Sequence, residues 1–289
     1  MRITTGLVVT SLCLMHAWAI AQPLDDRRLS RAQQGPDLKF PEEPKELSVL
    51  SPLEMAIYSP SGAGPFPTIV ILHTCGGLRP EIHDWTKRAL ERGYAVFVMD
   101  SLGQRGFKNG CNPPNGVLST RGAKDALQAR EHLRKFAFVD QGRVALVGYS
   151  WGAMAGLLVS SSGVAGQFSS ARYDAVVSFY PECYRQRVDF EWLRGDVDKP
   201  LLVLMGEEDN ETPPSECIPR LEKLKEGGAP VEWHLYPATT HCWDCSSMHN
   251  SSKTDMNGNQ VTYRYDEKVT QDSARRMFEF LSKHLKAGK

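Results

Sequence analysis

The sequence predicts an α/β protein with a mostly parallel, doubly wound sheet and helices on both faces. Short apolar runs of strand length occur at residues 68–73, 94–99, 144–147, 173–180, 200–205 and 232–236. Segments with helical spacing or small, helix-compatible residues lie between them or close the chain, at 82–93, 123–136, 153–159, 212–227 and about 265–284. Strands that alternate with helices in this way are joined by parallel crossovers. With no repeat and no internal linker, residues 45–289 are expected to form one domain.

The first 44 residues are expected to lie outside that domain. Residues 1–21 have a basic start, an apolar stretch and an Ala-x-Ala sequence ending at Ala21, which is typical of a cleavable signal peptide. The apolar stretch is too short for a membrane span. We therefore expect cleavage after Ala21, a periplasmic or secreted protein, and no membrane association of the mature chain. Residues 22–44 are polar and contain several prolines, which predicts an extended N-terminal arm.

The next segment is expected to form the edge of the sheet and then a loop beside the reaction centre. Residues 46–58 favour two short strands, as an antiparallel edge, before the buried strand at 68–73. That strand continues into Thr74-Cys75-Gly76-Gly77, where two glycines allow a turn that exposes backbone N–H groups. The backbone amide of Cys75 is therefore a candidate oxyanion donor, although an ordinary glycine-rich turn is the alternative. His73 is expected to anchor this loop through hydrogen bonds rather than to act as a base.

A long loop at residues 101–115 follows the strand at 94–99, and loops of this length are often functional. Arg105 in this loop is a candidate for binding a substrate carboxylate. An arginine that is solvated or held in a structural ion pair is an equal alternative.

Residues 144–156 contain the pattern Gly148-x-Ser150-x-Gly152 between an apolar strand and a small-residue helix. A serine on such a sharp strand-to-helix turn stands clear of the backbone and is typical of a serine hydrolase nucleophile. The positive end of the helix favours the charge that develops in acyl transfer. We expect Ser150 to be the nucleophile and the amide of Trp151 to be the other oxyanion donor. A glycine-serine turn without chemistry is the alternative.

The acid and the base are expected after the late strands. A serine needs a base held by a third group, and Asp209 and His241 follow the strands at 200–205 and 232–236 in the order serine, acid, histidine. They are the predicted triad partners of Ser150. The alternatives, which fit these positions less well, are Glu207 and Glu208 for the acid and His234, His249 and His284 for the base.

Six cysteines remain after removal of the predicted signal peptide: Cys75, Cys111, Cys183, Cys217, Cys242 and Cys245. An even number in an oxidising compartment predicts disulfides, whose pairing the sequence leaves open. We favour Cys183 with Cys217, because both follow strand ends at what should be one edge of the sheet. Cys75 with Cys111 is the next pair. The chain also carries 34 basic and 34 acidic residues among its 289, which gives no basic footprint for nucleic acid and favours a small-molecule partner. Its oligomeric state stays open.

Four segments together resemble the dienelactone hydrolase family of α/β-hydrolases, from about residue 50 to the C-terminus. They are Leu72-His-Thr-Cys-Gly-Gly77, Gly148-Tyr-Ser-Trp-Gly152, Gly206-Glu-Glu-Asp209 and Tyr236-Pro-Ala-Thr-Thr-His241. The resemblance implies an α/β-hydrolase fold with a sheet of about eight strands. It also implies hydrolysis of small esters or lactones with no cofactor and no metal.

The chain departs from the name-giving enzymes of that family around the reaction centre. Ser150 replaces their cysteine nucleophile, Thr74 replaces a glutamate, and Cys242-Trp-Asp-Cys245 lies where they have an arginine. Thr74, Arg105 and Tyr149 are the candidate substrate-binding residues, with core packing as the alternative for Tyr149. We therefore expect a small carboxylic ester or lactone as substrate rather than dienelactone in particular.

Two other classes of function remain open. The Cys242-x-x-Cys245 motif fits a thiol–disulfide or metal-binding role, and a structural disulfide next to His241 is the simpler interpretation. The chain could also be a binding protein with the hydrolase fold that has lost catalysis.

Overall fold

The computed structural model of the chain describes residues 29, 35–48, 51–111, 117–186, 189–255 and 258–286. The predicted signal peptide at 1–21 lies outside the described residues, as does most of the predicted arm before residue 35. The signal peptide therefore stays a prediction. The described part of the arm corrects the expectation that it lies outside the domain, because Leu38 is buried in a core cluster and Asp37 pairs with Arg121.

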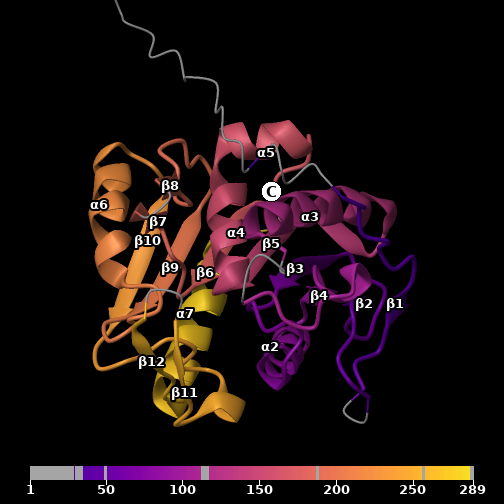
Figure 1. Cartoon of the computed structure of the whole chain (residues 1–289). Helices are drawn as coiled ribbons and strands as arrows, with labels where there is room; N and C mark the ends of the chain where they lie inside the picture. The colour runs from indigo at the N-terminus through magenta and orange to yellow at the C-terminus, as the bar shows by residue number, and fades with distance from the viewer. Residues whose placement is uncertain are drawn as a thin grey trace, which may run out of the picture.

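An eight-stranded sheet forms the centre of the described part, in the spatial order β1-β2-β4-β3-β5-β6-β9-β10 (Figure 1). Its strands are β1 (Pro44–Lys45), β2 (Ala56–Tyr58), β3 (Phe66–Leu72), β4 (Ala95–Met99), β5 (Val139–Tyr149), β6 (Ala175–Phe179), β9 (Leu201–Gly206) and β10 (Val231–Tyr236). Every neighbouring pair is parallel except β2 with β4. The prediction of a mostly parallel α/β sheet is thereby confirmed.

Helices cover both faces of the sheet. They are α2 (Pro80–Leu90), α3 (Ser119–His132), α4 (Trp151–Ser160), α5 (Ser162–Phe168), α6 (Ile218–Glu226) and α7 (Glu267–His284). Apolar side chains of α3, α4, α5 and α6 belong to one core cluster, and those of α2 and α7 belong to the other. The central helix α4 is buried along its whole length, which explains why its sequence has no polar face.

Burial on both faces explains the continuous apolar runs of the inner strands. In β3, Ile69 and Ile71 pack in the cluster with α2, whereas Val70 and Leu72 pack in the cluster with α4. Because strand side chains alternate between faces, each position of such a strand must be apolar.

The edge of the sheet differs in part from the prediction. Only β2 lies within residues 46–58, and it runs antiparallel to β4, but β1 precedes that range and runs parallel to β2. The predicted helix at 212–227 is also shorter, because a 3-10 turn at Pro214–Glu216 precedes α6. Proline lacks the N–H that a continuous helix would need there.

Two small hairpins accompany the sheet, and the sequence did not reveal them. They are β7 (Tyr184–Arg185) with β8 (Phe190–Glu191), and β11 (Ser252–Thr254) with β12 (Gln260–Thr262). The second lies in the polar segment 242–265. Both are short and mostly polar, so they lack the apolar alternation that predicts strands.

Three disulfides link Cys75 with Cys111, Cys183 with Cys217, and Cys242 with Cys245. Both pairings favoured from the sequence are present. The first two close loops of 36 and 34 residues, for which chain-entropy arguments give about 4 kcal/mol each. The third spans only 3 residues and on the same argument contributes about 1.5 kcal/mol.

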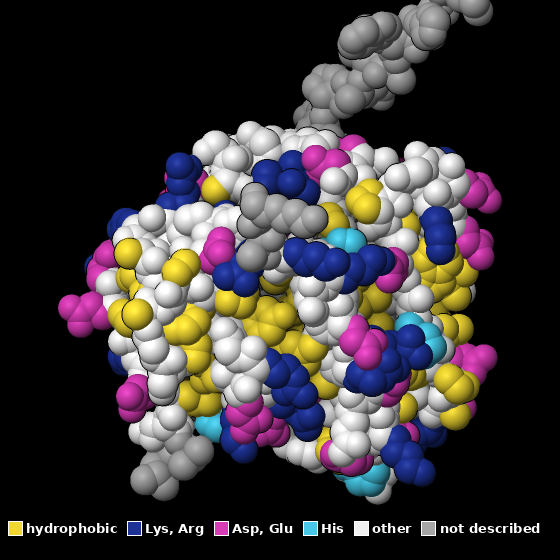
Figure 2. All heavy atoms as spheres, turned by 180° about the vertical axis from the view of Figure 1, so that it is seen from behind, with side chains coloured by type: hydrophobic (Ala, Val, Ile, Leu, Met, Phe, Trp, Pro, Cys, Tyr) yellow, Lys and Arg dark blue, Asp and Glu magenta, His cyan; other side chains and the backbone are white. Residues whose placement is uncertain are grey.

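Basic and acidic side chains lie close together over the face shown in Figure 2, in keeping with the equal numbers of charges in the sequence. Among the described residues, none of the helices combines the length and the apolar character needed to span a bilayer.

Candidate active site

Ser150 occupies the turn between β5 and α4, with a positive φ of 50°. The chain turns so tightly there that a Cβ on Gly148 would lie 2.2 Å from the carbonyl oxygen of Gly152. A Cβ on Gly152 would lie 2.5 Å from the carbonyl oxygen of Leu72. Only glycine fits at both positions, and this explains the Gly-x-Ser-x-Gly pattern.

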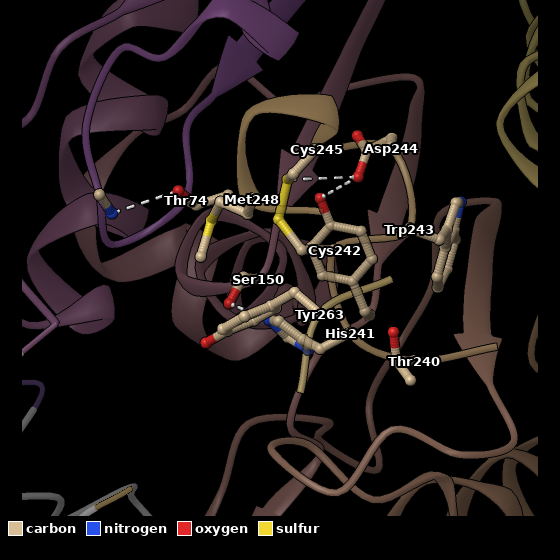
Figure 3. The surroundings of a disulfide bond; sticks show 12 residues. Thr74, Ser150, Thr240, His241, Cys242, Trp243, Asp244, Cys245, Met248 and Tyr263 are labelled. Carbon is tan, nitrogen blue, oxygen red and sulfur yellow. Dashed lines mark hydrogen bonds between the residues drawn. A yellow bond between two sulfur atoms is a disulfide. The ribbon is translucent and has the colours of Figure 1, made fainter. Parts of the chain in front are cut away.

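Ser150, His241 and Asp209 lie in one hydrogen-bonded chain, as predicted from the sequence. His241 Nε2 is 2.9 Å from Ser150 Oγ, and His241 Nδ1 is 2.7 Å from Asp209 Oδ2. Figure 3 shows the serine and the imidazole pointing toward each other. All three residues are buried, which strengthens their electrostatic coupling. The arrangement is suited to moving the serine proton to the imidazole.

Asp209 is held by its own loop. Its carboxylate accepts hydrogen bonds from the backbone amides of Glu211 at 3.0 Å and Thr212 at 2.9 Å. The Thr212 hydroxyl lies 2.8 Å from Oδ2 and 3.1 Å from the carbonyl oxygen of Tyr180. With the imidazole as a further donor, the carboxylate is fixed in position and its charge is stabilised. The sequence did not single out Thr212 or Tyr180.

Glu211 places a further carboxylate beside the imidazole. Its Oε2 is 3.9 Å from His241 Nε2 and accepts a hydrogen bond from Tyr263 Oη at 2.6 Å. Its Oε1 accepts a hydrogen bond from Lys253 Nζ, also at 2.6 Å. Lys253 lies in β11 and Tyr263 directly follows β12, so Glu211 ties this hairpin to the reaction centre. No sequence pattern pointed to this group, because the hairpin reaches Glu211 only in the folded chain.

The environment of His241 acts on its pKa in two directions. Burial lowers the pKa, but the negative charges of Asp209 and Glu211 raise it by more, so the net shift is upward from 6.5. For Glu211, burial raises the pKa, while the charges of His241 and Lys253 lower it to a greater extent. The two carboxylates therefore stabilise the imidazolium that forms when His241 takes a proton.

The loop after β3 lies against the turn that carries the serine. The amide of Gly152 donates to the carbonyl oxygen of His73 at 3.2 Å, which brings Cys75 close to the start of α4. The amide of Gly110 donates to the carbonyl oxygen of Cys75 at 2.7 Å, and the disulfide to Cys111 fixes the same residue. Within the described residues, the amides of Cys75 and Trp151 make no hydrogen bond. They are available as the predicted pair of oxyanion donors.

His73 is the loop anchor that the sequence predicted. The ring is fully buried, lies 2.6 Å from the carbonyl oxygen of Thr74 through Nδ1, and accepts the amide of Ser101 at Nε2 at 3.2 Å. It also stacks on the Trp151 ring at 5.3 Å. Burial lowers its pKa, so the neutral ring serves as a structural bridge.

Two of the three candidate substrate-binding residues have other roles in the structure. Arg105 forms a two-point ion pair with Asp125 at 2.7 and 2.8 Å, and its side chain is only 9% exposed. It fixes the loop to α3, which corrects the prediction of a substrate carboxylate contact. Tyr149 is fully buried and packs against Trp85 and Phe179, so it takes the core-packing alternative rather than a substrate-binding position.

The remaining candidate, Thr74, lies in the loop after β3, and Trp151 follows the serine directly. The hydroxyl of Thr74 accepts the amide of Gly76 at 3.2 Å, so its visible role is to shape the loop, and a substrate contact stays a prediction. The indole of Trp151 packs on α3, where a Cβ on Gly122 would lie 2.4 Å from the ring. Its side chain therefore belongs to the core.

One group of possible metal ligands was found among the described residues, formed by Glu81, Cys242 and Cys245 with donor atoms within 4.8 Å of one another. Their two sulfur atoms are bonded to each other. As a disulfide they offer no thiolate to a metal.

Comparisons with known proteins bear on the family and the fold of the chain. The sequence model of the dienelactone hydrolase family matches residues 53–285. A curated Escherichia coli (strain K12) protein described as "Putative carboxymethylenebutenolidase" is 23% identical over 210 residues, which are 66% of this chain and 74% of the relative.

Solved structures show the same fold. Esterase 2 of Thermogutta terrifontis, phosphoramylated by tabun, superposes with a TM-score of 0.60 at 18% identity, covering 81% of this chain and 90% of the esterase. MGS-M1, an α/β-hydrolase enzyme from a Medee basin deep-sea metagenome library, gives a TM-score of 0.56 at 21% identity, covering 76% and 85% of the two chains.

Proposed function

The chain belongs to the dienelactone hydrolase family and is a carboxylic ester hydrolase, and from this premise we propose that it acts through a serine triad. Ser150 is the nucleophile, His241 the base and Asp209 the group that orients the imidazole. The observation that carries the proposal is the continuous pair of hydrogen bonds, 2.9 Å from serine to imidazole and 2.7 Å from imidazole to carboxylate.

The reaction begins when Ser150 Oγ attacks the carbonyl carbon of the ester and its proton passes to His241 Nε2. The negative charge moves to the carbonyl oxygen, where the amides of Cys75 and Trp151 are positioned to receive it. Loss of one such donor typically reduces the rate by about 10²- to 10³-fold. Asp209 keeps the imidazole in the tautomer whose Nε2 lone pair faces the serine.

The intermediate collapses when His241 gives its proton to the leaving alcohol and leaves an acyl group on Ser150. Water then enters, gives a proton to Nε2 and attacks the acyl carbon. The serine leaves with the proton, and the acid is released. No cofactor takes part in this scheme, and the partner is a small-molecule carboxylic ester or lactone.

The nucleophile is tested by activity and by labelling. Ser150→Ala should abolish hydrolysis of p-nitrophenyl acetate and the reaction with a fluorophosphonate probe. Phosphoramylation of the Thermogutta terrifontis esterase by tabun motivates an organophosphorus probe. Ser282→Ala, at an exposed position of α7, is the control and should retain both. Full hydrolysis by Ser150→Ala would end the proposal, and binding of esters without turnover by the native chain would favour a non-catalytic binding protein.

We also propose that the mature protein is periplasmic or secreted and begins at Gln22. The Ala-x-Ala sequence before Gln22 and the three disulfides support this location. N-terminal sequencing of protein from separated cell fractions is the test. A cytosolic protein that retains residues 1–21 would refute it.

A further inference from the structure

The turn that follows His241 contains a buried disulfide with an acidic neighbour. Cys242 and Cys245 are 4% and 0% exposed, and Glu81 at the start of α2 is 3% exposed. The two sulfur atoms and a carboxylate oxygen of Glu81 lie within 4.8 Å of one another. Figure 3 shows this disulfide and Asp244 in the turn beside His241 and Ser150.

Glu81 lacks the partners that a buried carboxylate normally has. Neither of its oxygens makes a hydrogen bond within the part of the chain that the structure describes. Buried acceptors without donors are unfavourable. Reduction of the disulfide would create two S–H donors within 4.8 Å of one of these oxygens. The surroundings of Cys242 and Cys245 are therefore better matched to a dithiol than to a disulfide.

The disulfide has a local rather than a global structural role. It joins residues only 3 apart, whereas the other two bridges close loops of 36 and 34 residues. A cross-link that closes a short loop adds little to the stability of the folded state. The disulfide instead restrains the backbone of Cys242, which has a φ of 56°. This angle lies in the left-handed region, which only some residues enter readily. Cys242 directly follows His241, so the bridge holds the backbone that carries the imidazole.

The same turn is connected to the triad through side chains. Asp244, between the two cysteines, accepts hydrogen bonds from Trp85 Nε1 at 2.7 Å and Tyr180 Oη at 2.8 Å. The Tyr180 ring packs edge-on against the His241 ring with centroids 4.6 Å apart. A change in the turn would therefore be transmitted to His241.

We propose that Cys242–Cys245 is a redox-active disulfide, that Glu81 accepts hydrogen bonds from its reduced dithiol form, and that its state sets the position of His241. The first two parts stand on the surroundings of the sulfur atoms alone. The third part rests on the proposed triad.

The reductant is a dithiol. One of its thiolates attacks Sγ of Cys242, the less buried sulfur, and Cys245 leaves as a thiolate. The second thiol of the reductant then attacks the mixed disulfide and releases Cys242. Two electrons and two protons pass to Cys242 and Cys245, which become thiols, and the reductant becomes a disulfide. In the oxidised state His241 is held in place, so we expect the oxidised form to be the active one.

The redox part is tested by equilibration of the native, purified chain in dithiothreitol buffers of graded ratio, followed by differential alkylation and peptide mapping. Cys242–Cys245 should be reduced at a milder ratio than Cys75–Cys111 and Cys183–Cys217, which serve as internal controls. Glu81→Gln should lower its reduction equilibrium constant about tenfold, as expected for a lost hydrogen bond to a charged group. Glu91→Gln, at an exposed site just after the same helix, should leave that constant unchanged.

Simultaneous reduction of all three disulfides would overturn the redox proposal. It would also be overturned if Glu81→Gln left the constant for Cys242–Cys245 unchanged. Both readouts are independent of hydrolysis, so they remain valid even if Ser150 is not the nucleophile. Glu81→Leu offers a second variant that removes both acceptor oxygens.

The coupling to His241 is tested by activity under conditions that reduce only Cys242–Cys245. The kcat for p-nitrophenyl acetate should fall about ten- to hundredfold, the range expected when a catalytic group is displaced by about 1 Å, and should recover on oxidation. A variant with Cys242→Ser and Cys245→Ser should be equally slow with and without reductant. Unchanged kcat in the selectively reduced chain would overturn the coupling and leave the redox assignment intact.

Discussion

Asp209 and Glu81 are two carboxylic acids that lie against the segment 241–245, and each is 3% exposed. Their surroundings differ in the number of hydrogen-bond donors. Asp209 accepts from two backbone amides of its own loop and lies within hydrogen-bond distance of the Thr212 hydroxyl and His241. Glu81 accepts none within the described residues.

The comparison shows that burial alone does not give a carboxylate its role. Several hydrogen-bond donors surround the carboxylate of Asp209. Such donors are needed around an acid that stabilises an imidazolium. Burial without donors favours the neutral form of Glu81 and raises its pKa to about 7, with a further contribution from the charge of Asp244. The two buried carboxylates therefore differ in the hydrogen bonds that their surroundings supply.

Removal of the charge of Asp209 should have the largest effect on activity. Asp209→Asn should lower kcat for p-nitrophenyl acetate by about 10⁴-fold, because an amide favours the wrong imidazole tautomer. Asp198→Asn, an exposed acid paired with Arg172, is the matched control and should keep full activity. A loss of less than tenfold for Asp209→Asn would show that the two buried carboxylates are not functionally different.

Removal of the carboxyl group of Glu81 should change the free energy of unfolding rather than activity. The pKa of Glu81 is about 7 in the folded protein and near 4.5 when unperturbed. The folded state therefore binds more protons than the unfolded state between these values, and stability falls as the pH rises through them. Glu81→Gln should be close to the native chain at pH 5 and about 3 kcal/mol more stable at pH 8.

Urea unfolding of the disulfide-intact proteins at the two pH values measures this difference. Glu91→Gln is again the control, because Glu91 is exposed beside Lys87 and should show no pH-dependent change. An effect of Glu81→Gln that is the same at pH 5 and pH 8 would contradict the raised pKa.

The smallest effect is expected from Glu211, the second acid beside His241. His241 must be neutral to act as a base, so activity is present above its raised pKa and is lost as the pH falls through it. Glu211→Gln removes one of the charges that raise this pKa. The acid limb of kcat/KM should therefore move to lower pH, by about half to one unit for a partly screened charge at this distance.

Glu208→Gln provides the matched control, because Glu208 lies in the same loop but is exposed and pairs with Arg264. Its pH profile should coincide with that of the native chain. An unmoved acid limb in Glu211→Gln would mean that Asp209 alone sets the protonation of His241.

Local patterns were sufficient wherever one stretch of chain carried the whole signal. The elbow at Ser150 was predictable because the two glycines and the serine are neighbours in sequence, and their close approach depends only on the local turn. Asp209 and His241 were predictable because α/β-hydrolases place the acid and then the histidine in loops after late strands. For Arg105 and Tyr149 the sequence left two alternatives open, and it could not choose the ion pair and the core packing that the structure shows, because Asp125 and the aromatic core lie elsewhere in the sequence.

The sequence by itself determined the alternation of strands and helices, the buried sheet and the three residues of the candidate triad. It favoured, without fixing them, the disulfide pairings that the structure shows. Only the tertiary structure decided that Glu211 is tied to hairpin residues 42 and 52 positions away. It also decided that Asp209 is surrounded by hydrogen-bond donors and that Glu81 lies next to Cys242 and Cys245 without a hydrogen bond among the described residues. The reason is physical. Backbone propensity and burial patterns act between neighbours along the chain, whereas the protonation and partners of a buried side chain depend on which distant groups the fold brings into contact with it.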